Sequence, residues 1–424
     1  MPELKEWGIY VYYAADVESK EMQDAARSSL ESLASVGSSE DVGITAMIDL
    51  PGLDTPYYIM PQRPKGKYNW PVYPDRFLAN VDSANIQTIA DFLQWSDRNC
   101  PAKKVALIFW GHGYALDDFD PTLEQGGGGA DKGRATARAA SGFSADGHNE
   151  LRLLFDSTHD SVLNNRDFGS VLRSFDVSVG AKRKIQILGL DCCNMAMAEV
   201  VSELQEYADV LVAAESLLPF RSWLSEPALE KFLANCKLEP KDFAQAAIEL
   251  FIESYDPAED PYLELSACDL KKCGELERQV SDLTAALIAA IDEPENRAAI
   301  DRAWLRDVCF LADGFIDLGS FCKFLQQEMS GNARVSKAAG EVLTVLDQVV
   351  LYHGVAPASK DRNIALATGL TIWFPPWIRF PAVNYPQIDL SKRYLFNGYE
   401  LTRFAQVTNW DQFLCKLFYL TQSR

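Results

Sequence analysis

Histidine, paired cysteine and long apolar runs are scarce in this sequence, and each shortage excludes a class of protein. The four histidines stand far apart and no Cys-x-x-Cys pair occurs in the 424 residues, so the ligand spacing of a structural zinc site is missing. The nine cysteines are odd in number and irregularly spaced, unlike those of a disulfide framework. No stretch approaches the roughly 18 consecutive apolar residues of a membrane-spanning helix. We therefore expect no metal, no disulfides and no membrane insertion.

Positive charge is also in short supply. The 40 Lys and Arg residues face 60 Asp and Glu residues, which gives a formal net charge of −20 and a pI near 4.7. So acidic a chain repels phosphate backbones and anionic lipid headgroups, which argues against nucleic-acid and membrane partners. The first residues, MPELKEWGIYVYYAAD, carry charges where a signal peptide would be apolar. We expect a cytoplasmic protein, with an unconventional export route as the alternative.

Strand and helix signals alternate through the first half of the chain. Short runs rich in apolar, β-branched and aromatic residues predict buried strands. These strands cover residues 8–15, 43–50, 104–110, 184–191 and 209–215. Segments with helical spacing separate them: 21–35, a helix capped by Asp82 or Ser83 that runs to Arg98, one from Asn164 or Asn165 to Phe175, and 195–206. This order is typical of an α/β fold built on a doubly wound, mainly parallel sheet.

Two segments of the first half follow neither pattern. Residues 51–76 contain six prolines and five aromatic residues, which predicts an extended arm or hairpin. Residues 113–150 are polar and glycine-rich, as in a mobile loop or linker.

The second half reads differently. After about residue 222 the pattern becomes largely helical, with candidate helices at 226–236, 241–254, 271–291, 299–312, 317–328 and 335–352. A late strand is predicted at 369–375, and His353-Gly354 reads as a helix end. We expect one domain over 1–265 and a largely helical C-terminal region over 266–424.

Side chains that can take part in catalysis follow two of the predicted strands. His112 and Gly113 come directly after the strand at 104–110, and Cys192 and Cys193 come directly after that at 184–191. Because the carboxyl ends of parallel strands share one edge of a sheet, an imidazole and a thiol can meet there and give an activated nucleophile.

Two further features of this edge would assist such a nucleophile. A helix beginning near Asn194 would place its positive end beside the thiolate. Backbone N–H groups of Gly113 and of the nucleophile would bind a developing oxyanion.

These strand ends, IFWGHG and LGLDCCNM, resemble the catalytic motifs of the clostripain family of caspase-like cysteine peptidases. That family has an apolar strand followed by His-Gly, then one followed by Asp-Ala-Cys-x-Met. Further resemblances follow in the same order along the chain: LFDSTHDSVLNNRDF, ADVLVAAESLLPFRSW, LSACDL, GLTIWFPP and TNWDQFL. The resemblance implies a caspase-like, mainly parallel sheet flanked by helices.

The resemblance also implies roles for single residues. His112 matches the general base and Cys193 the nucleophile, while Cys192 takes the family's Ala position and reads as a buried small side chain. Gly113 and Cys193 would supply the oxyanion N–H groups. Asp191 matches an acid of the specificity pocket, although it can also cap the next helix.

The pocket loop departs from the family pattern. Where relatives often have Gly-x-Gly-Trp, this chain has PFRSW. The expected pocket therefore combines Asp191, Glu215 and Arg221, and an Arg beside Asp191 would partly neutralise it. The alternative is that Arg221 points to solvent. The family's preference for Lys or Arg before the scissile bond stays open on this point.

The glycine-rich stretch has two interpretations as well. It is either a flexible insertion or a site of self-cleavage of the kind known in some relatives. The candidate cleavage positions are Lys132, Arg134 and Arg138. A calcium site, which some relatives need, would fall on Asp117, Asp118 and Asp120, although a solvated acidic loop explains these residues too. We expect no cofactor.

The sequence thus predicts a cysteine endopeptidase with a His112/Cys193 dyad that cuts protein substrates inside the cell. Cleavage after Lys or Arg and a role in bacterial defence are narrower hypotheses, the latter by analogy alone. One alternative is a non-catalytic binding protein on the same fold. Another is a thiol hydrolase of a non-peptide amide or ester, which would not need the Gly-x-Ser-x-Gly elbow that the chain lacks.

Overall fold

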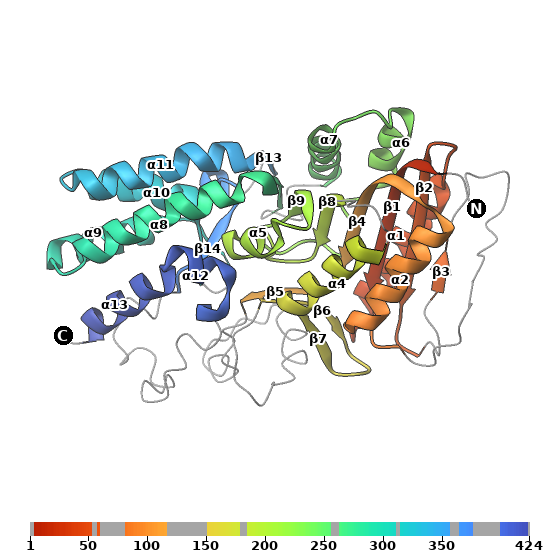
Figure 1. Cartoon of the computed structure of the whole chain (residues 1–424), viewed down its shortest axis with the longest axis horizontal. Helices are drawn as coiled ribbons and strands as arrows, with labels where there is room; N and C mark the ends of the chain where they lie inside the picture. Colours follow the sequence, from red (N-terminus) through yellow and green to blue (C-terminus); the bar gives the residue numbers. More distant parts are fainter. Residues whose placement is uncertain are drawn as a thin grey trace.

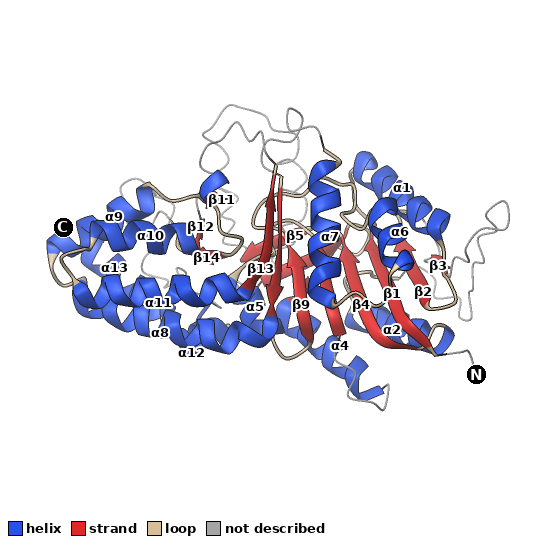
Figure 2. Cartoon of the chain, turned by 90° about the horizontal axis from the view of Figure 1, so that it is seen from above, coloured by secondary structure: helices blue, strands red, loops and turns tan. Residues whose placement is uncertain are grey.

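The computed structural model describes residues 4–52, 57–59, 81–116, 151–178, 185–255, 263–310, 314–356, 364–375 and 399–422. A central sheet organises them. Its strands are β1 (Lys5–Ala14), β2 (Val42–Asp49), β3 (Tyr57–Ile59), β4 (Ala102–Trp110), β8 (Ile185–Asp191), β9 (Ala208–Ala213), β10 (Glu264–Asp269) and β13 (Val350–Val355). The eight strands follow the order β13-β10-β9-β8-β4-β1-β2-β3 (Figure 2). The five from β9 to β2 are parallel, and β3, β10 and β13 pair antiparallel, which confirms the mainly parallel sheet.

Helices cover both faces of this sheet (Figure 1). One face carries α1 (Lys20–Val36), α6 (Glu226–Ala234) and α7 (Pro240–Glu253), and the other carries α2 (Ile86–Asn99), α4 (Asn165–Ser178) and α5 (Ala198–Leu204). Strand β1 shows how the sequence supports two cores: alternate side chains from Trp7 to Tyr13 join the α1 side, and those between them join the α2 side. Because successive side chains of a strand point to opposite faces, a strand buried on both faces must be apolar throughout.

The C-terminal region extends the core on the α5 side. Its helices are α8 (Cys273–Ala290), α9 (Pro294–Leu305), α10 (Leu318–Glu328), α11 (Ala333–Val349), α12 (Arg403–Thr408) and α13 (Trp410–Gln422). A small sheet of β11 (Cys309–Phe310), β12 (Phe315–Asp317) and β14 (Thr371–Trp373) lies among them. Short 3₁₀ turns occupy Leu270–Lys272, Ile364–Leu366 and Tyr399–Leu401.

A third sheet joins the edge where the active site is expected. It consists of β5 (Gly113–Leu116), β6 (Leu151–Asp156) and β7 (Ser161–Asn164). The segment expected to be a loop over 113–150 therefore begins as a strand, and its remainder lies outside the described residues. Of the arm at 51–76, β3 pairs with the edge strand β2, and most of the rest also lies outside them.

The observed strand pairing and the N-cap of one helix differ from three sequence predictions. His353-Gly354 lies within β13 rather than at a helix end, because Leu265 to Ala267 of β10 pair with it. The expected boundary at residue 265 falls inside β10, so the sheet continues from one expected domain into the other. Helix α2 is capped by Asn85, whose side chain accepts a hydrogen bond from the Gln87 amide at 2.8 Å, rather than by Asp82 or Ser83.

The described helices include no membrane-spanning segment. None of them combines the length and hydrophobicity that crossing a membrane requires.

Candidate active site

His112 and Cys193 follow neighbouring parallel strands and emerge at the same edge of the sheet. Strands β4 and β8 pair in register until Trp110 lies opposite Asp191. Just beyond, the Gly111 amide donates to the Asp191 carbonyl at 3.3 Å. The chain therefore leaves the sheet at matched positions, with His112 after one strand and Cys193 after the other.

Gly113 brings the two segments into contact. A Cβ atom at this position would lie 2.1 Å from the Cys193 carbonyl oxygen and 2.9 Å from the Cys193 nitrogen. Both atoms belong to the backbone and cannot swing aside, so only glycine permits this approach. The residue that follows His112 is thus held against the backbone of Cys193.

A Gly113→Ala variant should therefore move the two strand ends apart. We expect activity to fall by about 10²-fold, the usual cost of displacing catalytic groups by about 1 Å. The matched control is Gly331→Ala, where an added Cβ meets no atom within 4 Å. Steady-state kinetics on both variants, with circular dichroism to confirm folding, checks this; equal activity in the two would contradict the contact.

The Cys193 thiol is partly exposed and contacts the backbone of Leu218. The Leu218 amide donates to Cys193 Sγ at 3.3 Å. The chain reverses at Asn194, which has φ of 57°, and the Asn194 amide then bonds the Ser216 carbonyl at 2.9 Å. The loop after β9 is in this way anchored to the turn after β8, and it presents an N–H group to the sulfur.

The helix expected to begin at Asn194 begins only at Ala198 and spans seven residues. The intervening turn binds the loop after β9 instead, since the Ala196 amide donates to the Ala214 carbonyl at 2.7 Å. The expectation of a helix N-terminus beside the thiol is therefore wrong. The polar contact to the sulfur comes from Leu218.

Cys192 lies in a different environment from its neighbour. It is 1% exposed, belongs to the core on the α2 side and lies 3.6 Å from the Phe109 carbonyl oxygen. Burial raises the pKa of this thiol well above its usual value. It stays protonated at neutral pH and packs as a small apolar side chain.

His112 is half-buried, and its ring stacks on Tyr114 with centroids 5.6 Å apart and planes inclined by 28°. Burial lowers the pKa of His112 to about 4. The imidazole is therefore neutral at physiological pH, the protonation state in which it can accept a proton.

Asp191 is buried and contacts the loop that follows β9. It is 4% exposed and accepts hydrogen bonds from the Ser222 side chain and the Trp223 backbone. Burial raises the pKa of Asp191 to about 7, against the opposing effect of these bonds. The loop is also fixed by Trp110, whose indole N–H donates to the Phe220 carbonyl at 3.0 Å.

Arg221 does not lie beside Asp191. Its guanidinium donates to the Ser254 side chain and, at 3.2 Å, to the Ser254 carbonyl. It also lies 4.4 Å from the centroid of the Tyr255 ring. These contacts do not support the expected neutralisation of Asp191 by Arg221. The exposed guanidinium is directed toward the end of α7.

Glu215 is enclosed near the C-terminal region. It is buried behind the loop, where its carboxylate accepts a hydrogen bond from the Gly369 amide at 3.1 Å. Its burial and the nearby carboxylates raise its pKa well above the usual value. The side chain thus contacts the C-terminal region through Gly369.

Sequence reasoning missed the Leu218 contact, because a backbone N–H leaves no mark in a sequence. Tyr114 had a weak signal as an aromatic residue directly after His-Gly. The predicted cleavage and calcium positions lie outside the described residues: Lys132, Arg134, Arg138, Asp117, Asp118 and Asp120.

Comparison with known proteins places this geometry in context. The family model described as "Clostripain family" matches residues 142–416, which is more than half of the chain and includes Cys193. No curated protein matches.

Two solved structures resemble the chain over nearly its full length. One is a secreted C11 cysteine protease from Bacteroides thetaiotaomicron in complex with an irreversible peptide inhibitor: TM-score 0.63, 14% identity, 96% of this chain and 99% of that one. The other is an inactive zymogen C11 protease from Parabacteroides distasonis: TM-score 0.62, 13% identity, with the same coverage. At this identity the likeness concerns the fold, which is the α/β arrangement expected from the sequence.

Proposed function

Because the chain belongs to the clostripain family of cysteine peptidases, we propose that it cleaves peptide bonds with Cys193 as nucleophile and His112 as general base. One observation carries the proposal: Gly113, next to His112, is in contact with the backbone of Cys193. The partial exposure of Cys193 and the neutral state of His112 support it. Cys192 lacks the exposure that a nucleophile needs.

The proposed reaction begins with transfer of the Cys193 proton to His112. The sulfur attacks the carbonyl carbon of the scissile bond, and the backbone N–H groups of Gly113 and Cys193 bind the resulting oxyanion. His112 returns the proton to the leaving amine, which departs and leaves a thioester. Water, deprotonated by His112, then hydrolyses this thioester and frees the thiol.

We also propose that the residue before the scissile bond is Lys or Arg. The support is electrostatic: Asp191 is the acid at the strand end, and Arg221 turns away from it toward Ser254 and Tyr255. A substrate cation would favour the ionised form of Asp191, whose pKa of about 7 leaves it partly protonated before binding.

A peptide library tests both proposals at once. Wild type, Cys193→Ala and Asp191→Asn are each incubated with proteome-derived peptides, and new termini are read by mass spectrometry. We expect cuts after Lys and Arg in wild type, none with Cys193→Ala, and a loss of about 10²-fold in kcat/KM for basic substrates with Asp191→Asn. Cuts after other residues, unchanged by Asp191→Asn, would overturn the specificity and leave the dyad standing. Termini within the enzyme after Lys132, Arg134 or Arg138 would reveal self-cleavage.

We propose that the substrates are proteins of the cytoplasm, since all nine cysteines are unpaired, as is usual in a reducing compartment. A role in bacterial defence is one hypothesis within this class. The similar enzyme from Bacteroides thetaiotaomicron is described as secreted, so export is the competing outcome. Immunoblots of cell fractions and medium distinguish them.

A further inference from the structure

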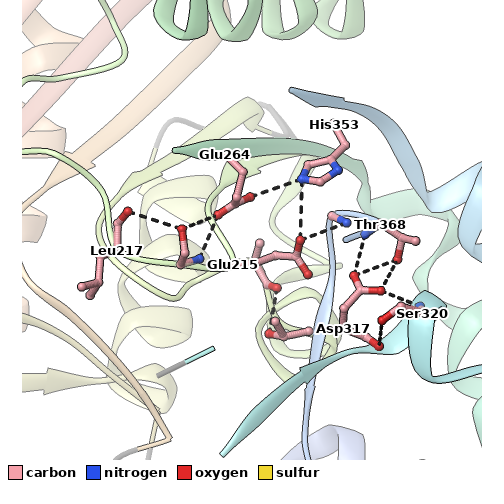
Figure 3. Close-up of polar contacts among 11 residues, drawn as sticks. Glu215, Leu217, Glu264, Asp317, Ser320, His353 and Thr368 are labelled. Atoms are coloured by element: carbon pink, nitrogen blue, oxygen red, sulfur yellow. Dashed lines mark hydrogen bonds and ion pairs between the residues drawn. The ribbon is translucent and has the colours of Figure 1, made fainter. Parts of the chain in front are cut away.

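A second group of titratable side chains lies where the central sheet meets the C-terminal region. Glu215 follows β9, Glu264 begins β10 and His353 lies within β13. Figure 3 shows the three side chains directed toward one another. The side chains of Glu215 and Glu264 are fully buried, and that of His353 is 11% exposed.

The contacts in this group are too long for hydrogen bonds. His353 Nε2 lies 3.6 Å from Glu215 Oε2 and 3.5 Å from Glu264 Oε2, beyond the range of an N–H···O bond. His353 Nε2, Glu264 Oε2 and Glu215 Oε1 have no hydrogen-bond partner. Buried polar atoms without partners are costly. Two enclosed carboxylates face one imidazole, and the Asp317 carboxyl lies beside Glu215, so negative charge is left uncompensated.

Groups of the surrounding loops already hold both carboxylates, at Glu264 Oε1 and at Glu215 Oε2, the oxygen that also faces His353. Ser216 donates to Glu264 Oε1 from its amide at 2.8 Å and from its hydroxyl at 3.0 Å. The Gly369 amide donates to Glu215 Oε2 at 3.1 Å. Outer contacts of this kind orient the carboxylates that bind metals in proteins.

The spacing matches the ligand shell of a small cation. One ligand atom from each of the three residues lies within 4.8 Å of the others. The separations of 3.5 and 3.6 Å are close to the roughly 3.3 Å between two ligands of a tetrahedral ion with bonds of about 2.0 Å. Imidazole with carboxylates suits zinc better than calcium, which prefers oxygen ligands alone.

We propose that Glu215, Glu264 and His353 form a binding site for one zinc ion. Its two positive charges would offset the negative charge of the two carboxylates and of Asp317, which lies beside Glu215. The ion would tie the loop after β9 to β10 and β13. Through Ser216 that same loop carries the Leu218 amide bonded to Cys193, so the metal would hold the backbone around the proposed nucleophile.

A second acidic group lies elsewhere in the structure and differs from the Glu215, Glu264 and His353 group. Asp16, Asp49 and Asp156 also lie close together, with His159 beside them. There, however, Asp156 accepts bonds from Ser83 and His159, and Asp16 accepts bonds from side chains of the β6–β7 turn. Because most of these oxygens are satisfied, this group serves as the control.

The test uses the full chain carrying Cys193→Ala, because a catalytic thiol beside a histidine would itself bind zinc. Metal-free protein is titrated with Zn²⁺ against a chromophoric chelator. We expect one site per chain, weakened at least about tenfold by His353→Gln and unchanged by His159→Gln. Co²⁺ bound in place of zinc should show no thiolate-to-metal charge-transfer band, since the ligands are nitrogen and oxygen.

A second variant guards against a folding defect in His353→Gln. Glu264→Gln keeps the oxygen that accepts from Ser216 and removes the charge that would face the metal, so it should weaken zinc equally. Equal affinity in the parent and both variants, absence of zinc binding, or a thiolate band with Co²⁺ would each overturn the proposal. Because the parent is already inactive, the result is independent of the proposed peptidase function.

Discussion

Replacing Cys193 with alanine is expected to lower kcat/KM for the best peptide substrate by at least about 10³-fold, whereas Cys192→Ala should change it by less than about threefold. The two thiols are adjacent in sequence and opposite in environment. Cys193 is partly exposed and accepts a bond from the Leu218 amide. Cys192 is enclosed in the core, where burial raises its pKa.

Each of these two variants is the control for the other, because each removes one thiol from the same turn. Steady-state kinetics gives the activity, and mass spectrometry after limited treatment with iodoacetamide locates the reactive thiol. We expect the label on Cys193, and none there in His112→Ala at neutral pH if the imidazole takes the thiol proton. Loss of activity in Cys192→Ala with retention in Cys193→Ala would reverse the assignment. Retained activity in both would remove the thiol mechanism altogether.

The sequence predicted the strands that carry His112 and Cys193 because these strands have a clear local pattern. Strands β4 and β8 are continuous apolar runs that end in polar residues, and such runs predict buried parallel strands. Their common edge follows from the parallel sheet, whereas the sequence left open whether they are neighbours, which the structure shows. The positions of His112 and Cys193 required no knowledge of any distant contact.

The sequence did not reveal β10, β13 or the group that they carry. Both strands are short and antiparallel, and β13 continues the apolar spacing of α11, so only pairing with β10 distinguishes it from a helix end. His353 of β13 meets Glu264 of β10 and Glu215 of the loop after β9, and no spacing along the chain encodes that meeting. The contacts of Arg221 were hidden for the same reason, since Ser254 and Tyr255 lie at the end of another helix.

The second large effect concerns stability, which should fall as the pH rises from about 5 to about 8. Burial raises the pKa of three carboxyl groups outside the proposed metal site: Asp49 to about 8, Asp191 to about 7 and Glu199 to about 7. In the unfolded chain these groups titrate near about pH 4. Between these values the folded protein holds more protons at these three groups than the unfolded chain does, which outweighs the opposite contribution of His112 below its ordinary pKa. Raising the pH therefore favours unfolding, and the stability is lost as the pH passes through the folded-state pKa values.

Glu199 offers the clearest test of whether stability falls as the pH rises. Its Oε1 accepts bonds from the Trp373 amide at 3.1 Å and the Tyr399 hydroxyl at 2.9 Å, and a glutamine oxygen can accept both. Glu199→Gln should therefore keep the contacts and remove this group's share of the pH dependence, on the order of 2 kcal/mol between about pH 5 and about pH 8. Chemical denaturation of the Cys193→Ala protein at several pH values, with a chelator present to exclude metal effects, measures it.

Glu328 provides the matched control because its shift has the opposite sign. Hydrogen bonds from Arg302 and Arg306 lower its pKa, so Glu328→Gln cannot remove a loss of stability that occurs near neutral pH. A free energy of unfolding that stays level or rises from about pH 5 to about pH 8, or an unchanged slope in Glu199→Gln, would contradict the assignment. The expected fall would mean that the buried acids of this fold are held as neutral carboxyl groups. Asp191 would then ionise readily only when a cation, such as a substrate side chain, lies beside it.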